Sequence, residues 1–309
     1  MTFAVLFPGQ GSQAVGMGAD VFDARPDLLG EAADEVLGWS LRSICLQGPE
    51  EELTRTDRAQ PALYAVAYAI WDELRARLTA QPSGAAGHSL GEYTALAASG
   101  ALSYLDGLRL VAARGAAMAD AAAREPSTMA ALIGADLPSA EALVAERRAD
   151  GGRLWVANIN APGQIVVAGG VEDVEWAAGV GRERGIRRVV PLKVAGAFHS
   201  PYMASAAEAL SAAVADTVFG EPGFAVYANA TGTAYDGQVG PTLVDQLTSP
   251  VRFAESLAAM AASGVTTFVH VGPGDVTAGL ARRSVEGAEI YVVSGIDDID
   301  AVAGALAAD

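Results

Sequence analysis

The stretch that decides the fold is residues 83–98, SGAAGHSLGEYTALAA. Its first six residues are mostly small and apolar and predict a short buried strand, whereas residues 91–100 predict a helix. Between them, residues 87–91 fit the pattern G-x-S-x-G, in which a tight strand-to-helix turn exposes a serine. Glycine on both sides permits a turn that a Cβ would obstruct. The stretch predicts an α/β fold with Ser89 as a nucleophile.

The segments on both sides of this stretch supply a sheet and its covering helices. A buried strand is expected at residues 2–7, followed by a glycine-rich turn at residues 8–11 and by helices through about residue 80. The turn is not a dinucleotide-binding motif, because a third glycine is missing at the required spacing. Three later strand-like runs, at residues 224–229, 266–271 and 289–293, would complete a parallel main sheet.

The middle of the chain has a different pattern. Strands are expected at residues 128–135, 154–160, 164–168 and 186–194, and helices at 138–149 and 171–184. This βαββαβ order is typical of a ferredoxin-like domain. We therefore expect a large α/β-hydrolase-like domain, residues 1–124 and 195–309, with a small ferredoxin-like domain inserted at residues 125–194.

The composition narrows the class of protein. The chain has 309 residues, is 51% hydrophobic and 18% charged, and carries a net charge of −17. These values describe a globular protein and argue against nucleic acid or an anionic membrane as a partner. The single cysteine, Cys45, excludes an internal disulfide and is expected to be a buried structural thiol. Because the first residues lack a signal peptide and the longest apolar run (61–71) is too short for a bilayer, we expect a cytoplasmic protein.

The charge is unevenly distributed. The segment from Arg124 to Lys193 contains nine basic and nine acidic residues, so the remainder of the chain carries the whole net charge. A neutral segment in an acidic protein could be the place where an acidic partner docks, or it could be an ordinary solvated surface.

A serine nucleophile needs a base, and the chain offers three histidines. His88 is adjacent to Ser89 and is expected to pack beneath the turn. His270 lies within an apolar strand, which favours a structural role. His199 lies in a loop before a helix, at the junction of the two predicted domains, and is the best candidate base.

Arg114 is a candidate for substrate binding. It lies at the border of an apolar stripe on the helix predicted at residues 104–123, whereas Arg109 on the same helix faces Asp106 and is expected to be solvated. An arginine beside the core could form a structural ion pair. The alternative is that it binds a substrate carboxylate through two parallel hydrogen bonds.

Together, these motifs resemble one family: the malonyl-CoA:acyl carrier protein transacylases of dissociated fatty-acid synthesis, with the related acyltransferase domains of polyketide synthases. The matching motifs occur in the family's order across nearly the whole chain, and together they are specific. They are Pro8-Gly9-Gln10-Gly11-Ser12-Gln13, Gln60-Pro61-Ala62-Leu63, Gly87-His88-Ser89-Leu90-Gly91-Glu92, Arg114-Gly115, Asn158-x-Asn160-x-Pro162-Gly163-Gln164, Gly196-Ala197-Phe198-His199-Ser200, Gln246-Leu247 with Ser249-Pro250-Val251, and Val271-Gly272-Pro273-Gly274.

The resemblance implies a role for each site residue. Ser89 would be the nucleophile and His199 its base, oriented by the backbone carbonyl of Gln246 rather than by a carboxylate. The backbone N–H groups of Gln10 and Leu90 would form the oxyanion hole. Substrate binding would use Arg114, Asn160 and Phe198, and an aromatic residue before the histidine is typical of family members that favour malonyl.

The resemblance also implies the partners. The substrates would be malonyl-CoA and a holo acyl carrier protein, with no bound cofactor and no metal, and the protein would be a monomer. Since the carrier protein is acidic, we expect it to dock at basic residues between the domains, with five candidates: Arg187, Arg188, Lys193, Arg282 and Arg283.

Two positions depart from the family's pattern. His270 replaces a commoner glutamate and is expected to affect packing. Ser249 replaces a commoner asparagine, which makes the hydrogen bonding near Gln246 less certain.

Three other functions compete with this prediction. A discrete acyltransferase serving a polyketide synthase would have the same motifs. A serine thioesterase or other hydrolase would usually need an acidic partner for His199, and would have no use for Arg114. A non-catalytic scaffold would be expected to lose Ser89, His199 or Arg114.

Overall fold

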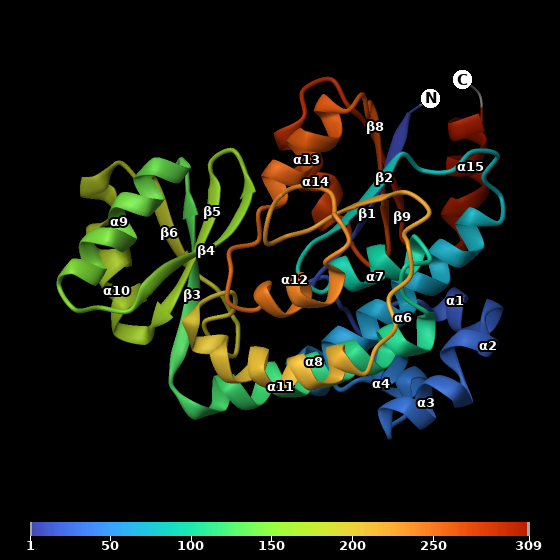
Figure 1. Ribbon diagram of the computed structural model, residues 1–309, viewed down its shortest axis with the longest axis horizontal. Helices are drawn as coiled ribbons and strands as arrows, with labels where there is room; N and C mark the ends of the chain where they lie inside the picture. The colour runs from blue at the N-terminus through green and yellow to red at the C-terminus, as the bar shows by residue number, and fades with distance from the viewer. Residues whose placement is uncertain (1, 308–309) are drawn as a thin grey trace.

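Two β-sheets organise the computed structural model, which describes residues 2–307 (Figure 1). The main sheet is parallel throughout and has the strand order β7-β2-β1-β8-β9. Its strands are β1 (Phe3–Phe7), β2 (Gly84–Gly87), β7 (Ala225–Tyr227), β8 (Thr267–Val271) and β9 (Glu289–Val293). The predicted parallel sheet is confirmed.

Helices cover both faces of the main sheet, as a buried parallel sheet requires. Along β1, Phe3, Val5 and Phe7 belong to the core beneath α6 (Thr56–Arg75) and α7 (Gly91–Ala98). Ala4 and Leu6 point the other way, into the core with α13 (Phe253–Ala262) and α14 (Val276–Ser284). This alternation buries all five residues of β1, so the turn that follows it has a fixed position.

The remaining helices of the large domain lie around these layers. Helix α8 (Tyr104–Arg124) packs against α6 and α11. The others are α1 (Ala19–Ala24), α2 (Pro26–Leu29), α3 (Glu31–Leu37), α4 (Leu41–Gln47), α5 (Glu50–Thr54), α11 (Ala204–Ala215), α12 (Val239–Asp245) and α15 (Ile299–Ala307), with 3₁₀ turns at Pro201–Met203 and Ile296–Asp298.

The second sheet is antiparallel, with the strand order β4-β5-β3-β6. Its strands are β3 (Ser127–Ile133), β4 (Leu154–Ala161), β5 (Gln164–Gly170) and β6 (Arg188–Pro191), and α9 (Leu137–Ala149) and α10 (Val171–Val180) cover its outer face (Figure 1). The chain order is βαββαβ, which confirms the ferredoxin-like arrangement.

In the small domain, the helix expected at residues 171–184 and the strand expected at residues 186–194 are shorter than predicted. The helix expected at residues 171–184 ends at Val180 and continues as a 3₁₀ turn, Gly181–Arg184, that stops at Gly185 in a left-handed conformation (φ 78°). The last strand of the small sheet spans only Arg188–Pro191, because it is an edge strand that ends at a proline.

The small sheet also contacts the large domain through backbone hydrogen bonds. The N–H of Ile159 donates to the carbonyl of Val251, and the N–H of Val251 donates to the carbonyl of Ala157, both over 2.8 Å. These bonds fix β4 against the segment that follows α12. We keep residues 125–194 as the proposed limits of the small domain.

Cys45 is fully buried, and burial raises the pKa of its thiol to about 12.

Within residues 2–307, no helix is both long and apolar enough to cross a membrane.

Candidate active site

Ser89 lies between the end of β2 and the start of α7, with a left-handed backbone (φ 52°) that only the surrounding structure can enforce. The two glycines of the motif allow the turn to close. A Cβ on Gly87 would lie 1.8 Å from the carbonyl carbon of Gly91, and a Cβ on Gly91 would lie 2.3 Å from the carbonyl oxygen of Phe7. Neither position can hold a larger residue without moving backbone.

Asn229, just after β7, stabilises the strained turn from the neighbouring strand. Its Oδ1 accepts a hydrogen bond from the N–H of Ser89 over 2.7 Å, and its Nδ2 donates to the carbonyl of Gly87 over 2.8 Å. Because Asn229 is fully buried, these bonds are protected from water. They hold the backbone on both sides of His88.

His199 contacts the serine directly. Its Nε2 lies 2.8 Å from Ser89 Oγ, and its Nδ1 lies 2.9 Å from the backbone carbonyl of Gln246. A carbonyl oxygen only accepts, so Nδ1 carries the proton and Nε2 is free to accept one from the serine. Burial, and then the charge of Arg114, lower the pKa of His199 to about 3, so the imidazole is neutral. The backbone of Ser249 opposes the lowering of the His199 pKa, and this effect does not depend on the Ser249 side chain.

The other two histidines do not contact Ser89 Oγ within the described residues. His88 does not pack beneath the turn as expected. Its ring is part of the cavity wall, where it lies against Phe253 and hydrogen-bonds Asn160 Oδ1 over 2.7 Å. His270 is fully buried in β8, between the hydroxyl of Thr277 and the carbonyl of Gly272, away from the cavity.

Two backbone N–H groups near Ser89 are left without an acceptor. Between residues 2 and 307, no hydrogen bond uses the N–H of Gln10, in the turn after β1, or that of Leu90, which precedes α7. Leu90 N–H lies at a helix N-terminus, where the helix dipole favours negative charge.

Arg114 is fully buried on α8 and points at the nucleophile. Its Nη2 donates to Ser89 Oγ over 2.9 Å and to Gln246 Oε1 over 2.8 Å, and its Nη1 donates to Gln60 Oε1 over 2.7 Å. No ion pair in the described part of the chain involves Arg114, so it is not a structural ion pair. Burial lowers its pKa, but an arginine remains charged.

Arg109 differs from Arg114 although both are on α8. It is exposed and forms an ion pair with Asp106 over 2.8 Å, as predicted. Arg114 is therefore a buried cation beside the nucleophile with no anion in contact, which is the arrangement that a substrate carboxylate could complete.

A cavity of about 290 Å³ joins these groups and lies between loops and helices of the large domain on one side and the small sheet on the other. The turn after β1 and the helices α6 and α8 supply one side, including Gln10, Gln60 and Met118. The small sheet and its connections supply the other, namely Met129, Asn158, Asn160, Gln164, Val166, Leu192, Lys193 and Val194. Ser89, Arg114, Phe198 and His199 all line it.

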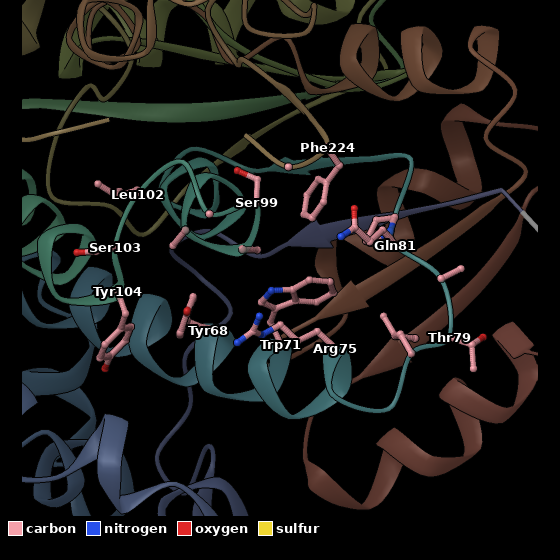
Figure 2. Close-up of a pocket in the computed structure, with 17 residues that line it drawn as sticks. Tyr68, Trp71, Arg75, Thr79, Gln81, Ser99, Leu102, Ser103, Tyr104 and Phe224 are labelled. Atoms are coloured by element: carbon pink, nitrogen blue, oxygen red, sulfur yellow. The ribbon is translucent and has the colours of Figure 1, made fainter. Parts of the chain in front are cut away.

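A larger cavity of about 610 Å³ lies elsewhere, beside the C-terminal half of α6 (Figure 2). Figure 2 shows Trp71, Tyr68 and Arg75 from that helix, with Phe224 above Trp71. Its lining, all within the described residues, contains no histidine, cysteine or carboxylate, and its one charged side chain, Arg75, pairs with Asp72 over 2.7 Å. The hydroxyl groups in this lining therefore have no histidine, cysteine or carboxylate within the lining that could activate them for catalysis.

The five basic residues predicted to dock a carrier protein are exposed, and none takes part in an ion pair within residues 2–307. Lys193 lines the cavity. Arg283 donates a hydrogen bond to Gln164, at the turn between β4 and β5. Arg187 packs beside Gly134, whose N–H donates to the carbonyl of Gly163 in the same turn. The structure therefore brings Arg187 and Arg283 near the β4–β5 turn, and Arg188 is in register with Ile133, which pairs with Gln164 at that turn. Within residues 2–307, no contact ties Arg282 to the turn.

Four polar residues at the site were not predicted: the buried Gln60, Glu92 and Asn229, and the half-buried Tyr235. Glu92 could have been found, because it is a carboxylate in an otherwise apolar helix directly after the nucleophile. Asn229 and Tyr235 had no such signal, since their position depends on the pairing of β7 with β2. Within residues 2–307, no cluster of three histidine, cysteine or acidic side chains is placed to hold a metal ion.

Comparisons with known proteins agree with this geometry. A family model described as "Acyl transferase domain" matches residues 4–300. The malonyl CoA-acyl carrier protein transacylase of Escherichia coli K12 is 38% identical over 309 residues, covering 98% of each chain. The polyketide biosynthesis protein ThaF of Burkholderia thailandensis is 42% identical over 283 residues, covering 91% of this chain and 24% of that protein. A malonyl-transacylase solved in complex with its type II polyketide synthase acyl-carrier protein has a TM-score of 0.94 at 35% identity, covering 99% of this chain and 100% of that one.

Proposed function

The chain belongs to the acyl transferase domain family, and we propose on this premise that it transfers malonyl from malonyl-CoA to the phosphopantetheine thiol of an acyl carrier protein. The observation that carries the proposal is the contact between Arg114 and Ser89 Oγ, which places a buried, unpaired cation beside the nucleophile. The full-length similarity to malonyl transacylases supports the same function.

The first half-reaction forms an ester. His199 accepts the proton of Ser89 through Nε2 as Oγ attacks the thioester carbonyl of malonyl-CoA. The N–H groups of Gln10 and Leu90 bind the tetrahedral oxyanion, and each such donor is typically worth ~3 kcal/mol. The carbon–sulfur bond then breaks, the thiolate of coenzyme A takes the proton from His199, and malonyl-Ser89 remains.

The second half-reaction reverses the first with a different thiol. His199 accepts the proton of the phosphopantetheine thiol, the sulfur attacks the malonyl ester, and the carbon–oxygen bond to Ser89 breaks as the proton returns to Oγ. The cycle is therefore ping-pong. The coenzyme A thioester is a substrate, and no further cofactor takes part.

Selection of malonyl depends on two neighbours of Ser89. Arg114 pairs with the free carboxylate, whereas a neutral acyl group leaves the guanidinium buried and unpaired, which is costly. Phe198, 6% exposed in the cavity wall, crowds the position next to the thioester carbonyl and disfavours a substituent there.

A role in polyketide synthesis is the second candidate. It is supported by the similarity to ThaF and to a malonyl-transacylase bound to a type II polyketide synthase carrier protein. The same chemistry serves both pathways. A hydrolase is disfavoured, because His199 is oriented by a carbonyl oxygen and Arg114 would have no substrate group to bind.

We also propose that the protein is a cytoplasmic monomer that docks its acidic carrier protein near the β4–β5 turn. The support is the free positive charge of Arg187, Lys193 and Arg283 around that turn and the cavity, on a protein of net charge −17. Opposite charges there would orient the carrier protein toward the cavity.

Intact-protein mass spectrometry tests the function. The protein is exposed briefly to malonyl-CoA, acetyl-CoA or methylmalonyl-CoA and then chased with holo carrier protein. One malonyl adduct, absent in Ser89→Ala and transferred on chasing, is the expected result. Folded protein without an adduct would exclude malonyl transfer, and an adduct that water removes as fast as the carrier protein does would indicate a hydrolase.

A further inference from the structure

Glu92 is a fully buried carboxyl group that the reaction described above does not use. It lies on α7, three residues after Ser89, and three groups donate to it. These are Gln246 Nε2, the hydroxyl of Tyr235 and, over 3.1 Å, the N–H of Asn229. A buried carboxyl with this many partners holds them in one arrangement.

The side chain of Gln246 connects Glu92 to the reacting groups. Its Nε2 only donates, and it meets two acceptors, Glu92 Oε2 and the carbonyl of Ser89 over 3.0 Å. Its Oε1 only accepts, and it meets Arg114 Nη2 over 2.8 Å. The acceptor supplied by Glu92 therefore helps to decide which end of the amide faces Arg114.

The backbone of the same residue holds the base. The carbonyl of Gln246, at the C-terminal end of α12, accepts from His199 Nδ1 over 2.9 Å. Gln246 thus contacts the base through its backbone and the cation through its side chain. Anchoring its amide group anchors both contacts.

We propose that Glu92 is a positioning residue that fixes Gln246, and through it the placement of Arg114 and His199 against Ser89. The proposal rests on the proposed function, because it assigns Arg114 to the malonyl carboxylate. In this site a backbone carbonyl, not a carboxylate, contacts the histidine. The buried carboxyl of Glu92 acts on the base and on the cation only through Gln246.

The arrangement does not depend on the charge of Glu92. Burial raises the pKa of Glu92 to about 7, against the opposing effect of its hydrogen bonds. When the carboxyl is protonated, the proton can lie on the oxygen that faces Tyr235, and Oε2 still accepts from Gln246. A glutamine in the same place can do the same, with its oxygen toward Gln246 and its NH₂ toward Tyr235. An aspartate keeps the charge but is one methylene too short.

The test compares Glu92→Gln, Glu92→Asp and a matched control, Tyr235→Phe. The control removes a hydrogen bond to the other oxygen of Glu92 and leaves Gln246 untouched. Three quantities are measured for each variant: the rate of Ser89 acylation by malonyl-CoA, the rate of Ser89 labelling by a small fluorophosphonate, and the unfolding temperature. The fluorophosphonate needs Ser89 and His199 but has no carboxylate for Arg114.

We expect the rate of Ser89 acylation by malonyl-CoA in Glu92→Gln and in Tyr235→Phe to stay within about fivefold of that of the unmodified protein. In Glu92→Asp we expect this rate to fall about tenfold or more. In Glu92→Asp the malonyl reaction should fall more than the labelling, because it alone needs Arg114. Glu92→Asp with the unmodified rate would overturn the proposal. So would a loss in Tyr235→Phe as large as that in Glu92→Asp, or equal losses in both reactions that follow the unfolding temperature.

If Glu92→Asp does not fold, Glu92→Gln decides. A folded Glu92→Gln that loses tenfold or more in acylation would show that charge, not position, is what Glu92 supplies. Failure of the proposed function is distinguishable, since in that case the unmodified protein would label with fluorophosphonate but form no malonyl adduct.

Discussion

Arg114 and Ser89 are in direct contact, with the guanidinium Nη2 donating to the serine Oγ over 2.9 Å. The same oxygen lies 2.8 Å from His199 Nε2, so a fixed cation and a neutral imidazole share it. An acyl group that forms an ester at this oxygen and carries a free carboxylate then has the guanidinium within reach. The contact between Arg114 and Ser89 thus places the group that binds the substrate carboxylate directly beside the atom that attacks the thioester.

Removing Arg114 should change the acyl preference. Arg114→Ala is expected to lower Ser89 acylation by malonyl-CoA by roughly 10²–10³-fold, because a buried charge-assisted pair is lost. Acylation by acetyl-CoA, which has no carboxylate, should fall much less. Single-turnover mass spectrometry with each thioester measures both rates.

Arg109→Ala is the matched control for this prediction. Arg109 is on the same helix but is exposed and paired with Asp106, so its loss should leave both rates within about twofold. Equal losses with malonyl-CoA and acetyl-CoA in Arg114→Ala would contradict the assignment of Arg114 to the carboxylate.

The acylation rate should be insensitive to weak acid. His199 must be neutral to accept the serine proton, and its pKa is lowered from 6.5 to about 3 by burial and by Arg114. Since a lowered pKa extends the neutral form to lower pH, the rate with malonyl-CoA should stay within about twofold between pH 7.5 and pH 5. A rapid-quench series over this range measures it. A rate that halves near pH 6.5 would mean that the base titrates like an exposed histidine.

The turn at Ser89 should not tolerate a methyl group on Gly91. In Gly91→Ala the new Cβ would lie 2.3 Å from the carbonyl oxygen of Phe7, so backbone must move. We expect a loss of ~1–3 kcal/mol in the free energy of unfolding, together with a loss of fluorophosphonate labelling. Chemical denaturation and labelling measure the two effects.

Gly179→Ala is the matched control on α10, where a Cβ would meet nothing within 4 Å. It should gain ~0.5–1 kcal/mol from helix propensity and leave labelling unchanged. If Gly91→Ala behaved like this control, close packing at the turn would not be what requires glycine.

Charge reversal near the β4–β5 turn should weaken only the second half-reaction. The double variant Arg187→Glu with Arg188→Glu is expected to raise the KM for holo carrier protein about tenfold and to leave self-malonylation by malonyl-CoA unchanged. Arg42→Glu on α4, an exposed arginine outside the five docking candidates, changes the charge in the same direction and serves as control. An unchanged KM in the double variant, or an equal rise in Arg42→Glu, would remove this surface from the docking proposal.

The sequence predicted the elements that depend on local pattern. Ser89 was found because strand, turn and helix follow one another within 16 residues, and the ferredoxin-like order was found from alternating strand and helix patterns. The positions of His199 and Arg114 beside Ser89 are not local, since both depend on how distant segments pack. From the sequence, His199 could be placed only at the junction of the two predicted domains. Arg114 could be placed only at the border of the apolar stripe on its helix.

Glu92 itself stands out in the sequence, but the hydrogen bonds of the network around it could not have been predicted from pattern. Glu92, Asn229, Tyr235 and Gln246 come from three separate segments, and each would be an ordinary polar residue if its segment were exposed. Their meeting requires the parallel pairing of β7 with β2, which a short strand such as Ala225–Tyr227 hardly specifies. The prediction that His88 packs beneath the turn failed for a comparable reason. Its partner Asn160 belongs to the other sheet, so this contact too depends on how distant segments pack.

The division of the cavity wall has a practical consequence for engineering. The groups proposed to make and break bonds, Ser89, His199 and Arg114, belong to the large domain, whereas Asn160, Val166, Leu192 and their neighbours belong to the inserted one. We therefore expect residues 125–194 to be exchangeable as a unit if the backbone hydrogen bonds of Ala157 and Ile159 to Val251 are kept. Grafting residues 125–194 from a relative that uses another thioester would change the cavity wall that faces the acyl group. Ser89, His199 and Arg114 would stay in the original large domain.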